Sequence, residues 1–264
     1  MRYIVALLTL ALLSGCCAHE AGALTRYNDV AAETEVDCAS IYNNEKSLVV
    51  MGIGQSNHAN SVPVRYTPRN AVYTFFKGKC YVGRDPVLGA TGDGGSVLTR
   101  LADKVLDANP QYDNVIIVGG AVGGSSVIQW VWGNPLGTWI IVEQHLRLLS
   151  ANIELDMILW HQGEADILLT TAQYKYFFKV MRFWFRYFNL NAPIYIAQAS
   201  YCLGNSSQQI RDAQFQLAEE FDDLKHGPNT DTLDSSYRYD NCHFSDEGAD
   251  VHANLWLDAL TPDL

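Results

Sequence analysis

The stretch that most constrains this chain covers residues 47–57, with the sequence SLVVMGIGQSN. Its unbroken run of apolar residues is typical of a strand that is buried on both faces of a parallel sheet. The run ends at glycines, which permit a tight turn, and the turn carries one candidate nucleophile, Ser56. Ligands of open α/β sheets bind beyond the carboxyl ends of the strands, so the pattern places Ser56 where a ligand site is expected.

Three interpretations of this turn compete. Residues 52–57 match the dinucleotide fingerprint GxGxxG without its last glycine, and no acidic residue for a ribose occurs between Glu45 and Asp85. The nucleophile elbow GxSxG is not matched, because His58 replaces its second glycine. The third interpretation is a serine hydrolase of another type, which needs a His and usually an acid farther along the chain. A single serine in a turn is more often an ordinary turn residue.

The N-terminus has the form of an export signal. Arg2 precedes an apolar run over 4–13, which is too short to span a bilayer. Residues 13–16 (LSGC) resemble a bacterial lipobox, in which the position of Cys16 becomes the lipidated first residue of the mature protein. The alternative is simple cleavage after residues 21–23. Both interpretations predict export, and the lipobox predicts a membrane-anchored protein that faces the periplasm or the cell surface.

The remaining sequence predicts one globular domain. Residues 1–15 form the predicted signal, residues 16–45 a polar tether and lead-in, and residues 46–264 the domain. The net charge of −11 argues against nucleic acid and against docking on anionic lipid, which leaves the lipid anchor as the membrane contact. In an oxidising compartment the four cysteines beyond the signal can form two disulfides, with three possible connectivities, and leave Cys17 unpaired.

Strands and helices are expected to alternate after the Ser56 turn. A hairpin is expected over 71–82, and a glycine loop over 89–96 opens a helix that starts at 97. The later strands are expected at 114–120, 156–160 and 193–199, and the later helices at 139–150, 174–188, 206–222 and 246–260. The aromatic residues of 174–188 are expected in the core, although this helix could also dock a partner or a membrane surface. The βαβ spacing supports an α/β sandwich with a central parallel sheet.

Two groups of polar residues lie next to these elements. His161 begins a polar group, HQGEAD, at the expected carboxyl end of a strand. Asp240 and His243 stand three residues apart in a loop before the last helix, a spacing that lets the carboxylate orient the imidazole toward Ser56. A lone His before a helix is usually structural, but its pairing with Asp in a chain with an exposed turn serine favours catalysis.

Five short blocks occur in one order over residues 47–260: GQSN at 54–57, GDGG at 92–95, GGSS at 123–126, WHQGE at 160–164 and DNCHF at 240–244. Together they resemble the SGNH/GDSL hydrolase superfamily, and within it the sialate O-acetylesterase-like branch that includes carbohydrate esterase family 6. Each block is weak alone, and their common order makes the resemblance specific. The resemblance implies a flavodoxin-like three-layer α/β/α sandwich.

The resemblance also implies roles for individual residues. Ser56 would be the nucleophile, His243 the general base and then acid, and Asp240 the residue that orients His243. The oxyanion hole would combine the N–H of Ser56, the N–H of Gly94 (or Gly95) and the side-chain amide of Gln162. Contacts to the substrate are also expected from Gln55, Asn57 and Glu164. Independently of the resemblance, Trp130 and Trp132 could stack on a sugar, although a tryptophan is more often simply packed. The superfamily's usual residue at the third oxyanion position is Asn, and the branch that this chain resembles has Gln there.

The implied reaction is removal of O-acetyl groups from a carbohydrate through an acetyl-enzyme, without a metal or an organic cofactor. The sugar stays open among sialic acid, plant polysaccharide, peptidoglycan and the cell's own glycans, and no oligomeric state is predicted. One alternative is a lipase or thioesterase that acts on longer acyl esters. A second, of a different class, is a catalytically idle carbohydrate-binding lipoprotein on the same fold.

The expected fold selects one disulfide connectivity. Cys202 follows the strand that ends near residue 199, at the carboxyl edge of the sheet, and Cys242 lies in the loop that must reach this edge to meet Ser56. We therefore predict a bond between Cys202 and Cys242, which leaves Cys38 to pair with Cys80. The alternative is that Cys242 is a buried free thiol, since thiols are commonly buried.

Overall fold

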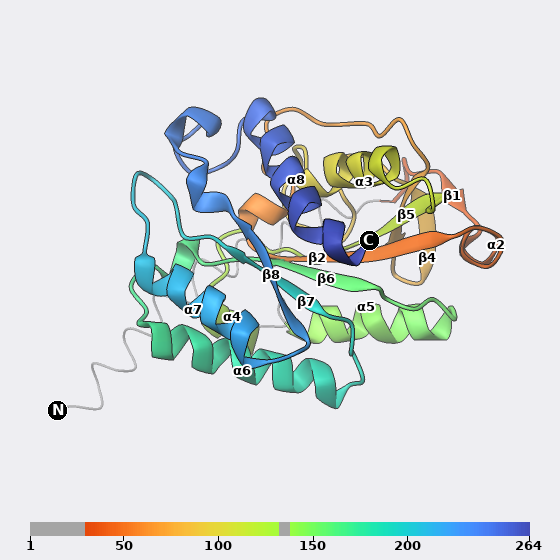
Figure 1. Cartoon of the computed structure of the whole chain (residues 1–264). Helices are drawn as coiled ribbons and strands as arrows, with labels where there is room; N and C mark the ends of the chain where they lie inside the picture. The colour runs from red at the N-terminus through yellow and green to blue at the C-terminus, as the bar shows by residue number, and fades with distance from the viewer. Residues whose placement is uncertain (1–29, 132–137) are drawn as a thin grey trace.

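The computed structural model describes residues 30–131 and 138–264. Within these residues eight strands form one sheet, in the order β1-β4-β3-β5-β2-β6-β7-β8 (Figure 1). Their bounds are β1 Glu35–Val36, β2 Ser47–Gly54, β3 Val72–Phe76, β4 Lys79–Val82, β5 Asn114–Gly119, β6 Met157–His161, β7 Ile194–Gln198 and β8 Leu224–Asn229. The neighbours from β3 through β5, β2, β6 and β7 to β8 are parallel, whereas β4 and β1 pair antiparallel at one edge.

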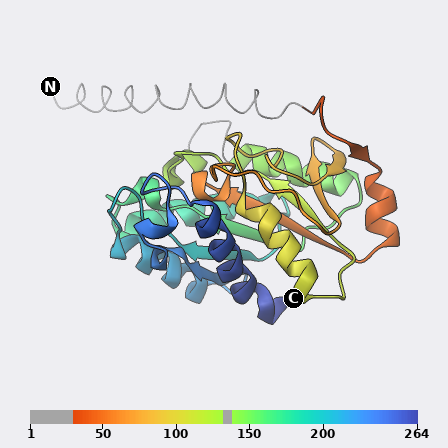
Figure 2. The ribbon, with the colours of Figure 1, turned by 90° about the horizontal axis from the view of Figure 1, so that it is seen from above.

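Helices cover both faces of this sheet. The helices are α2 Cys38–Asn44, α3 Val97–Ala108, α4 Val127–Val131, α5 Thr138–Ser150, α6 Thr171–Tyr187, α7 Gln208–Glu220 and α8 Asp246–Leu260. Helices α3 and α8 lie together on one face, and α4 to α7 lie on the other (Figure 1); Figure 2 looks down on the face with α3 and α8. The fold is the predicted three-layer α/β/α sandwich.

The central strand β2 is apolar throughout because it contributes to two cores. Successive side chains of a strand point to opposite faces. Val49, Met51 and Ile53 accordingly belong to the core under α4 to α7, whereas Leu48 and Val50 belong to the core under α3 and α8. Both faces of β2 are therefore dry, which explains why its sequence does not alternate.

Most of the expected elements are present, and three regions differ. The hairpin is β3–β4, and the predicted helix over 246–260 matches α8. Strand β8 was not predicted, because its sequence, LKHGPN, is polar and contains Pro; an edge strand tolerates both features. The short helix α4 was also missed. The lead-in does not stay apart from the domain: β1 pairs with β4, and α2 begins at Cys38.

Both predicted disulfides are present, between Cys38 and Cys80 and between Cys202 and Cys242. The first joins the lead-in to β4 at the antiparallel edge of the sheet. The second joins the segment after β7 to the loop before α8. Cys16, the rest of the predicted signal and Trp132 lie outside the described residues. No helix among the described residues is both long enough and apolar enough to cross a membrane.

Candidate active site

Ser56 stands on a sharp turn at the carboxyl end of β2. Gly54 has φ +124°, and a Cβ atom there would lie 2.0 Å from the carbonyl oxygen of His161, so the turn requires glycine. The N–H of Gln55 donates to that same carbonyl at 2.9 Å, and the N–H of Val122 donates to the carbonyl of Gly54 at 2.9 Å. The turn is thus fixed between the ends of β5 and β6, which leaves Ser56 half-buried at the sheet edge.

The structure brings Ser56, His243 and Asp240 together from opposite ends of the chain. The Oγ of Ser56 lies 2.9 Å from Nε2 of His243, and Nδ1 of His243 lies 2.6 Å from Oδ2 of Asp240. An acidic group held at Nδ1 keeps Nε2 as the nitrogen that can accept the hydroxyl proton. The arrangement therefore has the geometry of a nucleophile, a base and an orienting acid.

Asp240 is fixed by its own loop. Its Oδ1 accepts the N–H groups of Cys242 at 2.9 Å and of His243 at 2.6 Å, while Oδ2 accepts from the ring of His243. Partial burial alone would raise the pKa of Asp240, but the hydrogen bonds from the His243 ring and from the two amides outweigh it, so its pKa lies below the usual value. The Asp240 carboxylate is therefore ionised at neutral pH, and in this state it orients His243.

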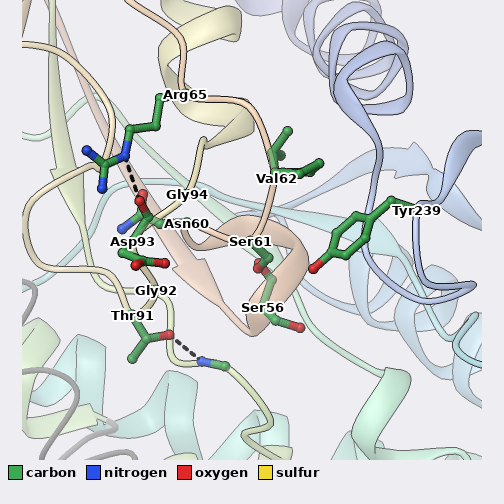
Figure 3. Close-up of a pocket in the computed structure, with 12 residues that line it drawn as sticks. Ser56, Asn60, Ser61, Val62, Arg65, Thr91, Gly92, Asp93, Gly94 and Tyr239 are labelled. Atoms are coloured by element: carbon green, nitrogen blue, oxygen red, sulfur yellow. Dashed lines mark hydrogen bonds between the residues drawn. The ribbon is translucent and has the colours of Figure 1, made fainter.

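A cavity of about 600 Å³ opens beside Ser56, within the size range of small-molecule sites. Figure 3 shows Arg65 and Asp93 on one side of Ser56 and Tyr239 on the other. Arg65 is exposed, and its Nε donates to the carbonyl of Asp93 at 2.7 Å. Tyr239 lies with its ring stacked at 6.1 Å from that of His243. The further lining residues are Asn60, Ser61, Val62, Pro63, Thr91, Gly92, Gly94 and Gly123.

The two additional oxyanion donors expected from the sequence are already engaged. The N–H of Gly94 donates to the carbonyl of Asn60 at 3.0 Å, and that of Gly95 donates to the carbonyl of Val62 at 2.6 Å. The amide of Gln162 is fully buried and donates to Oδ2 of Asp166 at 2.5 Å and to the carbonyl of Ser125 at 3.0 Å. In this structure these groups therefore donate to protein acceptors and not into the cavity. Loop 92–95 lines the cavity, but the N–H groups of Gly94 and Gly95 are bonded to carbonyls of the loop that follows Ser56.

The four residues expected to bind sugar are buried and do not line the cavity. Gln55, Asn57, Glu164 and Trp130 are 3%, 5%, 7% and 1% exposed. Oε1 of Gln55 accepts the N–H of Ala165 at 3.2 Å, and Nε1 of Trp130 donates to Oγ of Ser125 at 2.9 Å. The expectation that they contact substrate is corrected: they build the floor beneath the nucleophile turn.

Sequence reasoning missed several of the residues that face the cavity. Arg65 lies in a loop with no motif around it, Thr91 directly precedes the GDGG block, and Tyr239 directly precedes Asp240. Ser61 is also in the wall, and its Oγ donates to the carbonyl of Ser56. The one available signal was proximity in sequence to Ser56 and Asp240. Within the part of the chain that the structure describes, no group of three or more His, Cys, Asp or Glu side chains is placed to hold a metal ion.

Comparisons with known sequences give a match to one family model. A family model described as carbohydrate esterase, sialic acid-specific acetylesterase, matches residues 48–259. A comparison with curated protein sequences gives no significant match.

Solved structures share the fold at low sequence identity. A protein from Arabidopsis thaliana is 18% identical with a TM-score of 0.65, and the match covers 82% of this chain and 98% of that one. The protein NanS is 15% identical with a TM-score of 0.57, covering 83% of this chain and 98% of its own. A family 3 carbohydrate esterase from Clostridium thermocellum is 14% identical with a TM-score of 0.56, and the match covers 83% and 97%. At these identities the likeness concerns the fold alone.

Proposed function

Because this chain belongs to the carbohydrate esterase family of sialic acid-specific acetylesterases and is a carboxylic ester hydrolase, we propose that it removes O-acetyl groups from carbohydrate by a serine acyl-enzyme mechanism. The observation that carries the proposal is the chain of hydrogen bonds from Ser56 through His243 to Asp240, at the rim of the cavity. The substrate we propose is an acetylated sialic acid or an acetylated polysaccharide.

The reaction then proceeds in two steps. Ser56 Oγ attacks the acetyl carbonyl while Nε2 of His243 takes its proton, and the protonated His243 gives this proton to the departing sugar oxygen, which leaves as the alcohol. Water then loses a proton to His243 and attacks the acetyl carbonyl, acetate leaves as its bond to Ser56 breaks, and His243 returns the proton to Oγ of Ser56. Asp240 stabilises the imidazolium that forms in both steps. Each half-reaction uses the same three side chains.

We place the developing oxyanion near the N–H of Ser56 and the turn at Gly123 and Gly124. Among the residues that the structure describes, the Ser56 N–H has no acceptor, so it is available to an oxyanion. Gly123 lines the cavity with Ser56, and its N–H donates to Oγ1 of Thr91 at 2.7 Å. We propose the adjacent N–H of Gly124, which has no acceptor among the described residues, as the second donor. Backbone donors held in this way need no reorganisation when charge develops.

The cavity favours a small acyl group on a polar alcohol over a long acyl chain. Its lining is polar or small apart from Val62, Pro63 and the ring of Tyr239. A fatty acyl chain would bury methylenes against polar groups and lose about 0.8 kcal/mol for each CH₂ left without apolar contact. This composition argues against the lipase or thioesterase alternative. The complete set of Ser56, His243 and Asp240 argues against an idle binding protein.

The test is acetate release from O-acetylated sialic acid, acetylated xylan and an aryl acetate, together with labelling by a fluorophosphonate probe. Ser56→Ala should abolish both release and labelling without unfolding, because Ser56 lies on a half-buried turn. Ser61→Ala, which removes another hydroxyl from the same cavity, should still be labelled. Near-wild-type turnover by Ser56→Ala would overturn the mechanism.

We also propose that the protein is an exported lipoprotein anchored at Cys16, with residues 1–15 as its signal and the following residues as its tether to the domain. Two disulfides support an oxidising compartment, since such bonds are rare in reducing ones. Cys16→Ser should leave the precursor unprocessed or mislocalised, as shown by cell fractionation and mass spectrometry of the mature N-terminus. Correct cleavage of the variant without lipid would reject the anchor.

A further inference from the structure

A buried carboxylate lies directly beneath the nucleophile turn. The Glu164 side chain is 2% exposed, in the short 3₁₀ helix Glu164–Asp166 that follows β6. Its Oε1 accepts Nδ2 of Asn57 at 2.9 Å and Nε2 of His161 at 3.0 Å. A buried carboxylate is costly unless it is paired, so these two contacts indicate a function for Glu164 beyond filling space.

Asn57 connects this carboxylate to the loop that carries the proposed base. Its Nδ2 donates to the carbonyl of Cys242 at 3.2 Å, and its Oδ1 accepts the N–H of Phe244 at 3.3 Å. These two residues flank His243 in the sequence. One side-chain amide, adjacent to Ser56, therefore holds the backbone on both sides of His243.

The carboxylate decides which way the amide of Asn57 points. An ionised carboxylate accepts hydrogen bonds and cannot donate them, so the NH₂ end of Asn57 must face Glu164. The oxygen end then faces the N–H of Phe244. If the amide turned over, its oxygen would face the Glu164 carboxylate and its NH₂ group would face the N–H of Phe244. Glu164 thus fixes an orientation that the loop requires.

The contacts of His161 and Asn57 keep Glu164 ionised in this dry position. Nε2 of His161 faces Glu164, and its Nδ1 lies 3.2 Å from Nε2 of His252, which accepts the indole N–H of Trp256 at 3.0 Å. Burial would raise the pKa of Glu164, but the charge and hydrogen bond of His161, with the hydrogen bond of Asn57, lower it to about 2.

We propose that Glu164 is a positioning residue for the reaction: through the amide of Asn57 it sets the distance between His243 and Ser56. The proposal rests on the proposed function of Ser56 and His243. It assigns to Glu164 and Asn57 no contact with substrate, in keeping with their absence from the cavity wall. Their loss should therefore lower kcat and leave KM unchanged.

The experiment compares variants of two neighbouring carboxylates with an aryl acetate as substrate. Glu164→Ala removes the acceptor and should lower kcat by about 10²-fold at constant KM, the loss expected when a reacting group is displaced by about 1 Å. Glu164→Gln keeps an oxygen for Asn57 and should recover most of that loss. Asp166→Ala is the matched control: Asp166 is equally buried in the same helix, but its Oδ2 binds the N–H of Val127 and the amide of Gln162.

The outcomes separate positioning from folding. A merely structural role predicts similar losses of kcat for Glu164→Ala and Asp166→Ala, and that result would overturn the proposal. A rise in KM with kcat intact would also overturn it, because Glu164 would then bind substrate. If Glu164→Ala does not fold, Asn57→Ala carries the same prediction. The proposed function is judged separately, since its failure would show as an inactive wild type or an active Ser56→Ala.

Discussion

The two sides of the active site are built differently. On one side Ser56 and His243 rest on a fixed floor: buried Asn57 and Glu164 lie below them, and a disulfide holds Cys242 beside the base. On the other side the cavity wall consists of loops, with Arg65 exposed and Asp93 at the rim. In the proposed reaction the floor therefore holds Ser56 and His243 in place, whereas the open wall is free to select the alcohol that leaves.

The largest effect expected from breaking the fixed side concerns Asp240. Asp240→Asn places an amide where Nδ1 of His243 now finds a carboxylate, which favours the wrong tautomer and can lower kcat by up to about 10⁴-fold. KM for an aryl acetate should change little. Steady-state kinetics with active-site titration measures this. A rise in KM with kcat unchanged would show that Asp240 acts in substrate binding and not in the reaction.

The disulfides allow a matched comparison within one molecule. Cys202–Cys242 and Cys38–Cys80 span 40 and 42 residues, so replacing either pair by Ser should cost a similar stability, about 2–4 kcal/mol. Only the Cys202/Cys242 variant should also lower kcat, by about tenfold, because its bond adjoins His243. Denaturant unfolding and kinetics on the same samples measure both quantities. Equal kcat for the two variants would show that Asn57 and Arg238, which both donate to the Cys242 carbonyl, hold the loop without the bond.

These contrasts also show what the sequence could predict. The positions of Ser56, Asp240 and His243 were accessible because strand ends and a short Asp–His spacing are local patterns. The burial of Glu164 was not predictable, because a polar residue after a strand gives the same sequence pattern whether its side chain faces solvent or lies in the floor of a site. The engaged N–H of Gly94 was hidden for a related reason: its partner, Asn60, lies 34 residues away in a loop without periodicity.

The same limit applied to the fold. The central strands were predictable because both of their faces are dry, which forces continuous apolar sequence. Strand β8 was not, because only an edge position permits the polar sequence with Pro that it has. Sequence patterns thus predicted which strands are buried. They did not predict structure that depends on pairing at a sheet edge or on contact between distant loops.

The role of the open wall is tested by replacing Arg65. Arg65→Ala should raise KM for an O-acetylated acidic sugar by about tenfold, the value of one charge-assisted hydrogen bond, and leave kcat for an uncharged aryl acetate unchanged. Arg65→Lys keeps the charge and should recover part of the loss. Kinetics on both substrates measures the difference. A fall in kcat for the aryl acetate would show that this wall also supports the reaction.

The smallest effect concerns the stability of the fixed side, where Glu164 and Asp166 differ. Glu164 has His161 as a partner and a lowered pKa, whereas burial raises the pKa of Asp166 to about 6, outweighing its hydrogen bonds from Val127 and Gln162. Its pKa in the unfolded chain is 3.8. Between these values the folded protein binds a proton that the unfolded chain lacks, so this group makes stability rise as pH falls from 7 toward 4.

From pH 7 to pH 5 this contribution amounts to about 1 kcal/mol. Asp166→Asn removes the titrating group and should abolish that share of the gain, as measured by urea unfolding at both pH values. Asp85, whose pKa burial also raises to about 6, supplies an independent share, so the Asp85→Asn variant should lose a comparable amount and the double variant the sum. If Asp166→Asn kept the wild-type pH dependence of stability, burial of the Asp166 carboxylate would carry no electrostatic cost. The distinction between Glu164 and Asp166 would then rest on their hydrogen-bond partners alone.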